Sequence, residues 1–155
     1  MELWSFRIVD VFSERPLAGN QLAVFEDATS VPESLLQPLA QEIGYSETVF
    51  AYPGPNDADQ QIRIFTPTSE IPFAGHPVLG TAVVVATNTG ADRVVLETGR
   101  GLVPVRIDRT TGPATRGTME QPIPSHKLYD KGDEFLRPRR RSFPPPGHDL
   151  RQWSC

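Results

Sequence analysis

A glutamate at the start of an expected strand is the first candidate for chemistry in this 155-residue chain. Glu47 lies in the segment 44–50, where a loop leads into an apolar, β-branched stretch that favours a strand. A carboxyl group in that setting is partly removed from water, and burial raises a carboxyl pKa toward the range that suits proton transfer. The residues also allow an ordinary alternative, in which Glu47 is an exposed side chain at a strand start.

A glycine and a histidine directly before a helix form the second candidate. Gly75 and His76 precede Pro77, and proline is typical of the first position of a helix. Backbone N–H groups at a helix start have no partner within the helix, so they suit a carboxylate or another anion. His76 can donate a hydrogen bond or relay a proton. The alternative is simple capping of a core helix, with His76 a structural residue, and the residues do not decide between the two.

The remaining candidates are weaker. Gly19-Asn20 is more typical of a turn, although Asn20 could face a pocket. His126 and His148 lack a carboxylate or thiol at ligand spacing, so we expect no metal site. Neither a dinucleotide fingerprint nor a phosphate-binding loop occurs in the sequence, and no cofactor is indicated.

The elements that must position these residues are short strands and two helices, which predicts an α+β fold. We expect the first helix to run from about residue 30 or 31 to Ile43, or to begin near Leu36 or kink there because of Pro38. The second helix is expected to start at His76 or Pro77 and, being apolar nearly all round, to be the buried element. The expected strands are 5–12, 21–25, 48–52, 61–66, 93–98, 102–107 and 115–120.

Charge and composition divide the chain into two regions. The net charge is −7 over residues 1–125 and +3 over residues 126–155, which together give −4. The acidic balance argues against a nucleic-acid-binding surface, and the longest apolar stretch is too short to span a membrane. A lone cysteine, Cys155, excludes an internal disulfide, and the start lacks a secretory signal, so a cytoplasmic location is the default expectation. We interpret the Arg- and Pro-rich residues 125–155 as a disordered tail, with a basic or polyproline docking tail as the alternative.

Several segments, in this order, carry a resemblance to one family. Residues 9–12, 17–24, 46–50, and 65–67 leading into 72–77 resemble the PhzF-like phenazine-biosynthesis family, across roughly residues 5–122. The resemblance implies a domain similar to those of diaminopimelate epimerase, a curved antiparallel sheet wrapped around a central helix. It places that domain at residues 1–124.

The same resemblance implies an isomerase that needs no cofactor. A glutamate moves a proton between ring carbons of a dihydro-hydroxyanthranilate, and by motif that glutamate is Glu47. Ser46, Gly75 and His76 would contact the small carboxylate substrate, and Asn20 is a further pocket residue. Related epimerases use two opposed thiols, which a chain with one cysteine does not have.

Members of this family are about twice as long, with the site between two halves. Here the resemblance ends near Pro122 or Pro124, so we expect a truncated or frame-shifted product with low or no activity alone. Two alternatives are a module that only binds a small carboxylate and an inactive remnant. A homodimer, in which a second copy covers the exposed surface, is a further hypothesis.

Overall fold

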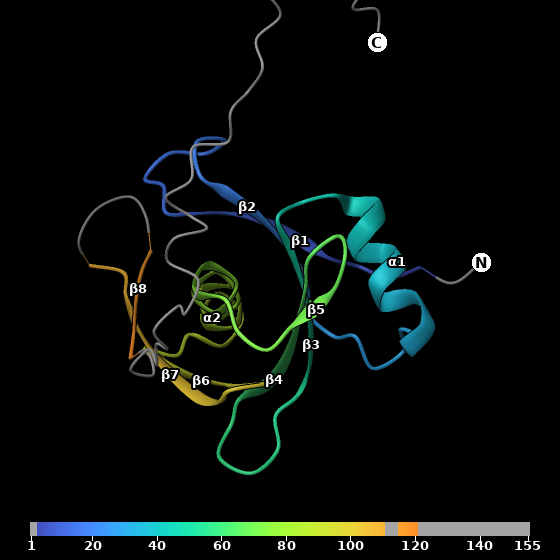
Figure 1. Cartoon of the computed structure of the whole chain (residues 1–155). Helices are drawn as coiled ribbons and strands as arrows, with labels where there is room; N and C mark the ends of the chain where they lie inside the picture. The colour runs from blue at the N-terminus through green and yellow to red at the C-terminus, as the bar shows by residue number, and fades with distance from the viewer. Residues whose placement is uncertain (1–2, 111–114, 121–155) are drawn as a thin grey trace, which may run out of the picture. The chain divides into compact units, whose positions relative to one another are not determined.

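The computed structural model describes residues 3–110 and 115–120, which contain eight strands and two helices (Figure 1). The strands are β1 Arg7–Val11, β2 Asn20–Phe25, β3 Glu47–Pro53, β4 Gln60–Phe65, β5 Glu70–Ile71, β6 Arg93–Thr98, β7 Gly101–Asp108 and β8 Arg116–Met119. The helices are α1 Glu33–Ile43 and α2 Gly75–Thr89. All of these elements belong to one compact unit that ends at Pro122, and the expected tail, residues 125–155, lies outside the described residues.

The strands form one curved sheet that wraps around α2 (Figure 1). Their order is β1-β2-β3-β4-β6-β7-β8, and β5 pairs with β4 beside this path. The expected α+β fold, a curved sheet around a helix, is confirmed. The sheet is mixed and not wholly antiparallel as the resemblance implied, because β2 with β3 and β4 with β6 run parallel while the other neighbours are antiparallel.

Helix α2 is buried because it has apolar residues on nearly every face. Its side chains pack against residues such as Leu22 and Val49 from the surrounding strands. We call this buried apolar cluster between α2 and the sheet the inner core. The helix begins earlier than expected, with Ala74 as N-cap, so that Pro77 is the third helical residue and not the first. A proline is tolerated there because N–H groups of the first turn have no partner within the helix. Gly90, at φ 76°, ends the helix in the left-handed conformation.

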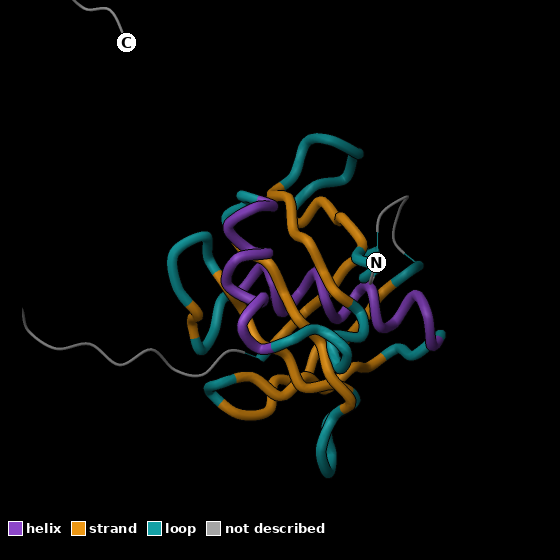
Figure 2. Tube along the Cα trace, turned by 90° about the vertical axis from the view of Figure 1, so that its right-hand side faces the viewer, coloured by secondary structure: helices purple, strands orange, loops and turns teal. Residues whose placement is uncertain are grey.

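Helix α1 lies against the outer face of the sheet, on the side away from α2 (Figure 1). Leu36 and Ala40 are its buried residues, and they pack with the stacked rings of Phe25 and Phe50. We call this second cluster, between α1 and the sheet, the outer core. The helix begins at Glu33, so the alternative start near Leu36 is wrong, and Pro38 lies inside it at the cost of one backbone hydrogen bond. Figure 2 shows both helices, in purple, from the side.

Strand β3 is buried on both faces because it lies between these two layers. Val49 and Ala51 belong to the inner core, and Phe50 between them belongs to the outer core. This alternation follows from the period of two in a strand. Residues of the same parity as Val49, including Glu47 at the start of the strand, therefore face α2.

The short strand β5 was not expected from the sequence. Two residues carry no periodic signal, and the strand depends on its pairing with β4. Arg63 of β4 binds Glu70 of β5 and Glu33 of α1 in ion pairs of 2.8 and 2.6 Å. Neither described helix is long and apolar enough to cross a membrane.

The inner core predicts a sharp difference between two leucine substitutions. Leu22 is fully buried on β2, whereas Leu102 on β7 is 53% exposed. Leu22→Ala should lower the free energy of unfolding by about 2–5 kcal/mol through lost burial and the cavity left behind. Leu102→Ala should change it by about 0.5 kcal/mol or less. Urea unfolding followed by circular dichroism measures both, and equal losses would contradict the assignment of the core.

Candidate active site

The start of α2 and the starts of two parallel strands meet at one edge of the sheet. Leu22 of β2 pairs with Glu47, so Asn20, two residues earlier on β2, also lies at this edge. Asn20 and Glu47 share the parity of the inner-core residues of their strands, and both side chains therefore point toward α2. His76 is the second residue of α2 and meets them there.

Glu47 and His76 face each other at the centre of this site. The Oε2 atom of Glu47 lies 3.2 Å from the Nε2 atom of His76, and the side chains are only 17% and 9% exposed. Both atoms are shielded from solvent, and neither has a well-aligned hydrogen bond within the described part of the chain. A contact that is close but poorly aligned is common in a catalytic site without its substrate. The alternative of an exposed Glu47 at a strand start does not hold.

Two polar side chains continue this chain of contacts from the other ring nitrogen of His76. The Nδ2 atom of Asn20 lies 3.3 Å from the Nδ1 atom of His76, and the Ser46 hydroxyl donates to Oδ1 of Asn20 at 3.1 Å. Asn20 and Ser46 are themselves exposed. The structure thus joins four of the sequence-predicted site residues in one chain of contacts.

His76 is held in its neutral form by its surroundings. Burial lowers the pKa of His76 below its usual 6.5, and the Glu47 carboxylate opposes this shift with a smaller effect. A neutral imidazole has one N–H and one acceptor nitrogen. The contact with Glu47 therefore brings a carboxyl group to within 3.2 Å of a ring that is neutral near pH 7.

The fifth predicted site residue, Gly75, begins α2 and is half-buried. The first intrahelical hydrogen bond is donated by Val78 to the carbonyl of Ala74. The backbone N–H groups of Gly75 and His76 precede it, and they are available to an anion at this helix start.

Sequence reasoning did not single out Phe12 as a site residue. Its ring lies 6.4 Å from the ring of His76, centre to centre, and is 73% exposed. Its backbone is left-handed, at φ 63°, which is uncommon for an aromatic residue and typical of functional positions. The only signal in the sequence was its place in the segment 9–12, because an exposed phenylalanine cannot be distinguished from a core one by its type.

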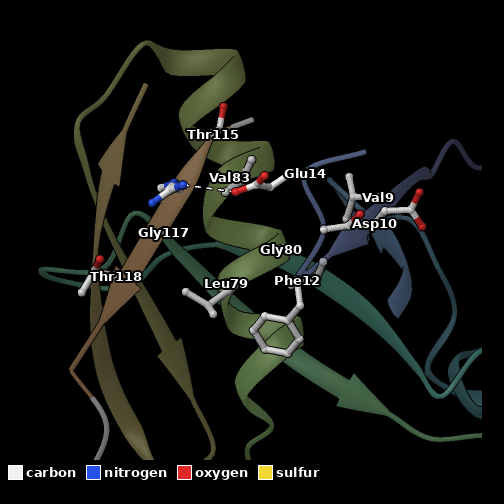
Figure 3. Close-up of a pocket in the computed structure, with 13 residues that line it drawn as sticks. Val9, Asp10, Phe12, Glu14, Leu79, Gly80, Val83, Thr115, Gly117 and Thr118 are labelled. Atoms are coloured by element: carbon white, nitrogen blue, oxygen red, sulfur yellow. Dashed lines mark hydrogen bonds and ion pairs between the residues drawn. The ribbon is translucent and has the colours of Figure 1, made fainter. Parts of the chain in front are cut away.

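A cavity of about 440 Å³ lies beside the site, between β1, β8 and α2 (Figure 3). Phe12 and Leu79 contribute to its lining, as do Glu14 and Arg116, which form an ion pair of 3.2 Å. Glu47 and His76 do not line this cavity. Phe12 thus lies next to both the cavity and His76.

Known proteins resemble this chain in sequence and in fold. A family model described as "Phenazine biosynthesis-like protein" matches residues 9–138. The trans-2,3-dihydro-3-hydroxyanthranilate isomerase of Pseudomonas aeruginosa is 41% identical over 129 residues, which cover 83% of this chain and 46% of that protein. The Pseudomonas fluorescens isomerase of the same name is 40% identical, over 86% of this chain and 48% of the relative.

Solved structures agree with these matches. A protein described as a predicted epimerase, from Pseudomonas aeruginosa, superposes with a TM-score of 0.69 at 35% identity, over 76% of this chain and 42% of that one. A PhzF-family protein of Bacillus anthracis gives a TM-score of 0.68 at 28% identity, over 77% and 40%. This chain spans less than half the length of the relatives described here. The described fold, the family model and the named relatives agree, and the chain belongs to the phenazine biosynthesis-like family, PhzC-PhzF, several of whose members are named isomerases.

Proposed function

We propose that this chain provides the proton-transfer centre of an isomerase that acts on a small carboxylate without a cofactor. The observation that carries the proposal is the buried contact of Glu47 with His76 at the start of α2. Identity of 41% to a trans-2,3-dihydro-3-hydroxyanthranilate isomerase supports a substrate of that class. Because the chain covers 46% of that relative, the activity of the chain by itself is part of the proposal.

In this proposal Glu47 serves first as base and then as acid. Its carboxylate takes a proton from one ring carbon, and the electron pair of the broken C–H bond moves into the neighbouring double bonds. The same carboxyl group then returns the proton to another carbon, so no electrons are gained or lost. Proton transfer by a positioned side chain contributes about 10²–10⁴-fold in rate.

His76 and the helix start would bind and orient in this reaction. The Nε2 atom of neutral His76 lies 3.2 Å from the Glu47 carboxyl group, and an N–H at that position would hold the carboxylate in place. The backbone N–H groups of Gly75 and His76 could donate hydrogen bonds to the substrate carboxylate at the positive end of the helix dipole. Direct contact of Ser46 and Asn20 with substrate stays a prediction, since both side chains already have partners in the unliganded chain.

Replacing Glu47 tests the proton transfer itself. Glu47→Gln keeps the shape of the side chain and removes its ability to accept a proton. Deuterium incorporation into trans-2,3-dihydro-3-hydroxyanthranilate in D₂O, followed by NMR, should fall about 10²-fold or more. Glu42→Gln, the same change at an exposed position on α1, is the matched control and should leave the rate unchanged.

Two outcomes would overturn the proposal. Equal incorporation by Glu47→Gln and Glu42→Gln would remove Glu47 from the reaction. No incorporation by the unaltered chain, together with binding heat in calorimetry, would replace the isomerase with a carboxylate-binding module.

The depressed pKa of His76 predicts a pH dependence of stability. The unfolded chain binds a proton at His76 near pH 6.5, whereas the folded chain binds it only at lower pH. The free energy of unfolding should therefore decrease as pH falls from about 6.5 toward the folded pKa, and this contribution should be constant above pH 6.5. His76→Gln, which cannot titrate, should lose less stability between pH 7.5 and 5. Urea midpoints of the two chains across this range measure the difference, and parallel curves would contradict a buried neutral His76.

A further inference from the structure

The two ring nitrogens of His76 face different partners. Nε2 lies 3.2 Å from the Glu47 carboxyl oxygen, and Nδ1 lies 3.3 Å from the Asn20 amide nitrogen. A neutral imidazole carries a single proton, which sits on one nitrogen or the other. Which nitrogen carries it decides whether His76 offers Glu47 a donor or a lone pair.

Only one arrangement satisfies both contacts while Glu47 is ionised. The Asn20 NH₂ group can only donate, so Nδ1 must be the acceptor and the proton must lie on Nε2, toward Glu47. The Ser46 hydroxyl then donates to the free Oδ1 atom of Asn20. If the Asn20 amide were turned over, the proton would move to Nδ1, and a lone pair on Nε2 would face the carboxylate in a site closed to solvent.

We propose that Asn20 is a positioning residue, which holds His76 in the Nε2–H tautomer and thereby directs an N–H, and not a lone pair, at the Glu47 carboxyl group. The role of Asn20 in catalysis rests on the function proposed above. Its role in setting the tautomer rests on the three contacts alone.

The preference for Nε2–H belongs to the ionised state of Glu47, and it reverses once Glu47 carries a proton. When Glu47 carries a proton, its O–H can donate to Nε2, and the His76 proton then belongs on Nδ1. A turned Asn20 amide would accept from Nδ1–H and donate to the Ser46 hydroxyl, which can also accept. An aspartate at position 20 could only accept, so it would favour Nδ1–H or the doubly protonated ring.

The tautomer can be read directly from the unaltered chain. Two-dimensional ¹⁵N NMR of the histidine side chains distinguishes a protonated ring nitrogen from a lone-pair nitrogen by its chemical shift. His76 should show a protonated Nε2 and a bare Nδ1 at pH 7.5, with the Nε2–H form favoured by about fivefold or more. The signals are assigned with His76→Gln. A protonated Nδ1, or an even mixture, would overturn the proposal without any variant having to fold.

Two aspartate variants test the role of Asn20. Asn20→Asp places a second carboxylate beside the ring, and the His76 titration should move up by about one pH unit or more, with Nδ1 protonated. Glu47 is the charged group in the described part of the chain that shifts the His76 pKa, so no other carboxylate should mask this effect. Asn56→Asp, in an exposed turn, adds the same charge and should leave the titration unchanged. Identical titrations of Asn20→Asp and the unaltered chain would contradict the proposal.

A third variant separates the orientation of the Asn20 amide from the charge at that position. Ser46→Ala removes the hydroxyl that holds Oδ1 of Asn20 and should weaken the preference for the Nε2–H form while leaving the His76 pKa nearly unchanged. These spectra need no substrate, so their outcome is independent of turnover. If NMR shows the Nε2–H form and no deuterium enters the substrate, the proposed isomerase is rejected and the positioning role of Asn20 is kept. If deuterium enters the substrate only when Glu47 is present, but NMR shows the His76 proton on Nδ1, the positioning role is rejected and the isomerase is kept.

Discussion

The enclosure of α2 by the curved sheet is the constraint on which the rest of the structure depends. The helix has almost no polar face, so it is stable only when strands surround it. This enclosure sets the first turn of the helix at the sheet edge where β2 and β3 begin. His76 and Glu47 are consequently taken out of water together. Burying either one alone would leave an unpaired polar group, whereas the contact between them offsets part of that cost.

Most of the fold could be predicted from the period of its apolar residues. The strands of four or more residues and both helices were expected within a few residues of their observed limits, because burial on one face or two leaves a clear pattern. Three features could not be predicted in this way. Strand β5 is too short to carry a pattern, the parallel pairings depend on contacts between distant segments, and Pro77 fits several positions of a first helical turn.

The residues of the candidate site could be named from the sequence, but their arrangement in space could not. Glu47 and His76 were notable because of their neighbours in the sequence. Their contact joins residues 29 positions apart and follows from the strand parity and the pairing of β2 with β3, neither of which a local motif contains. Asn20 was expected to face substrate, yet in the unliganded chain it binds His76. Phe12 carried no signal of its own, since its left-handed backbone is visible only in three dimensions.

The two-layered burial of β3 has a consequence for how this domain can vary. Glu47 is oriented by ladder hydrogen bonds to β2, and not by the long connection through α1 that joins the two strands. Residues in that connection could be added, removed or exchanged on the outer layer without turning the carboxylate. A single residue inserted within β3, next to Val49, would instead reverse the direction of every side chain before it and send Glu47 to the outer face. An insertion or deletion in the connection through α1 therefore leaves the direction of Glu47 unchanged, whereas an insertion within β3 reverses it.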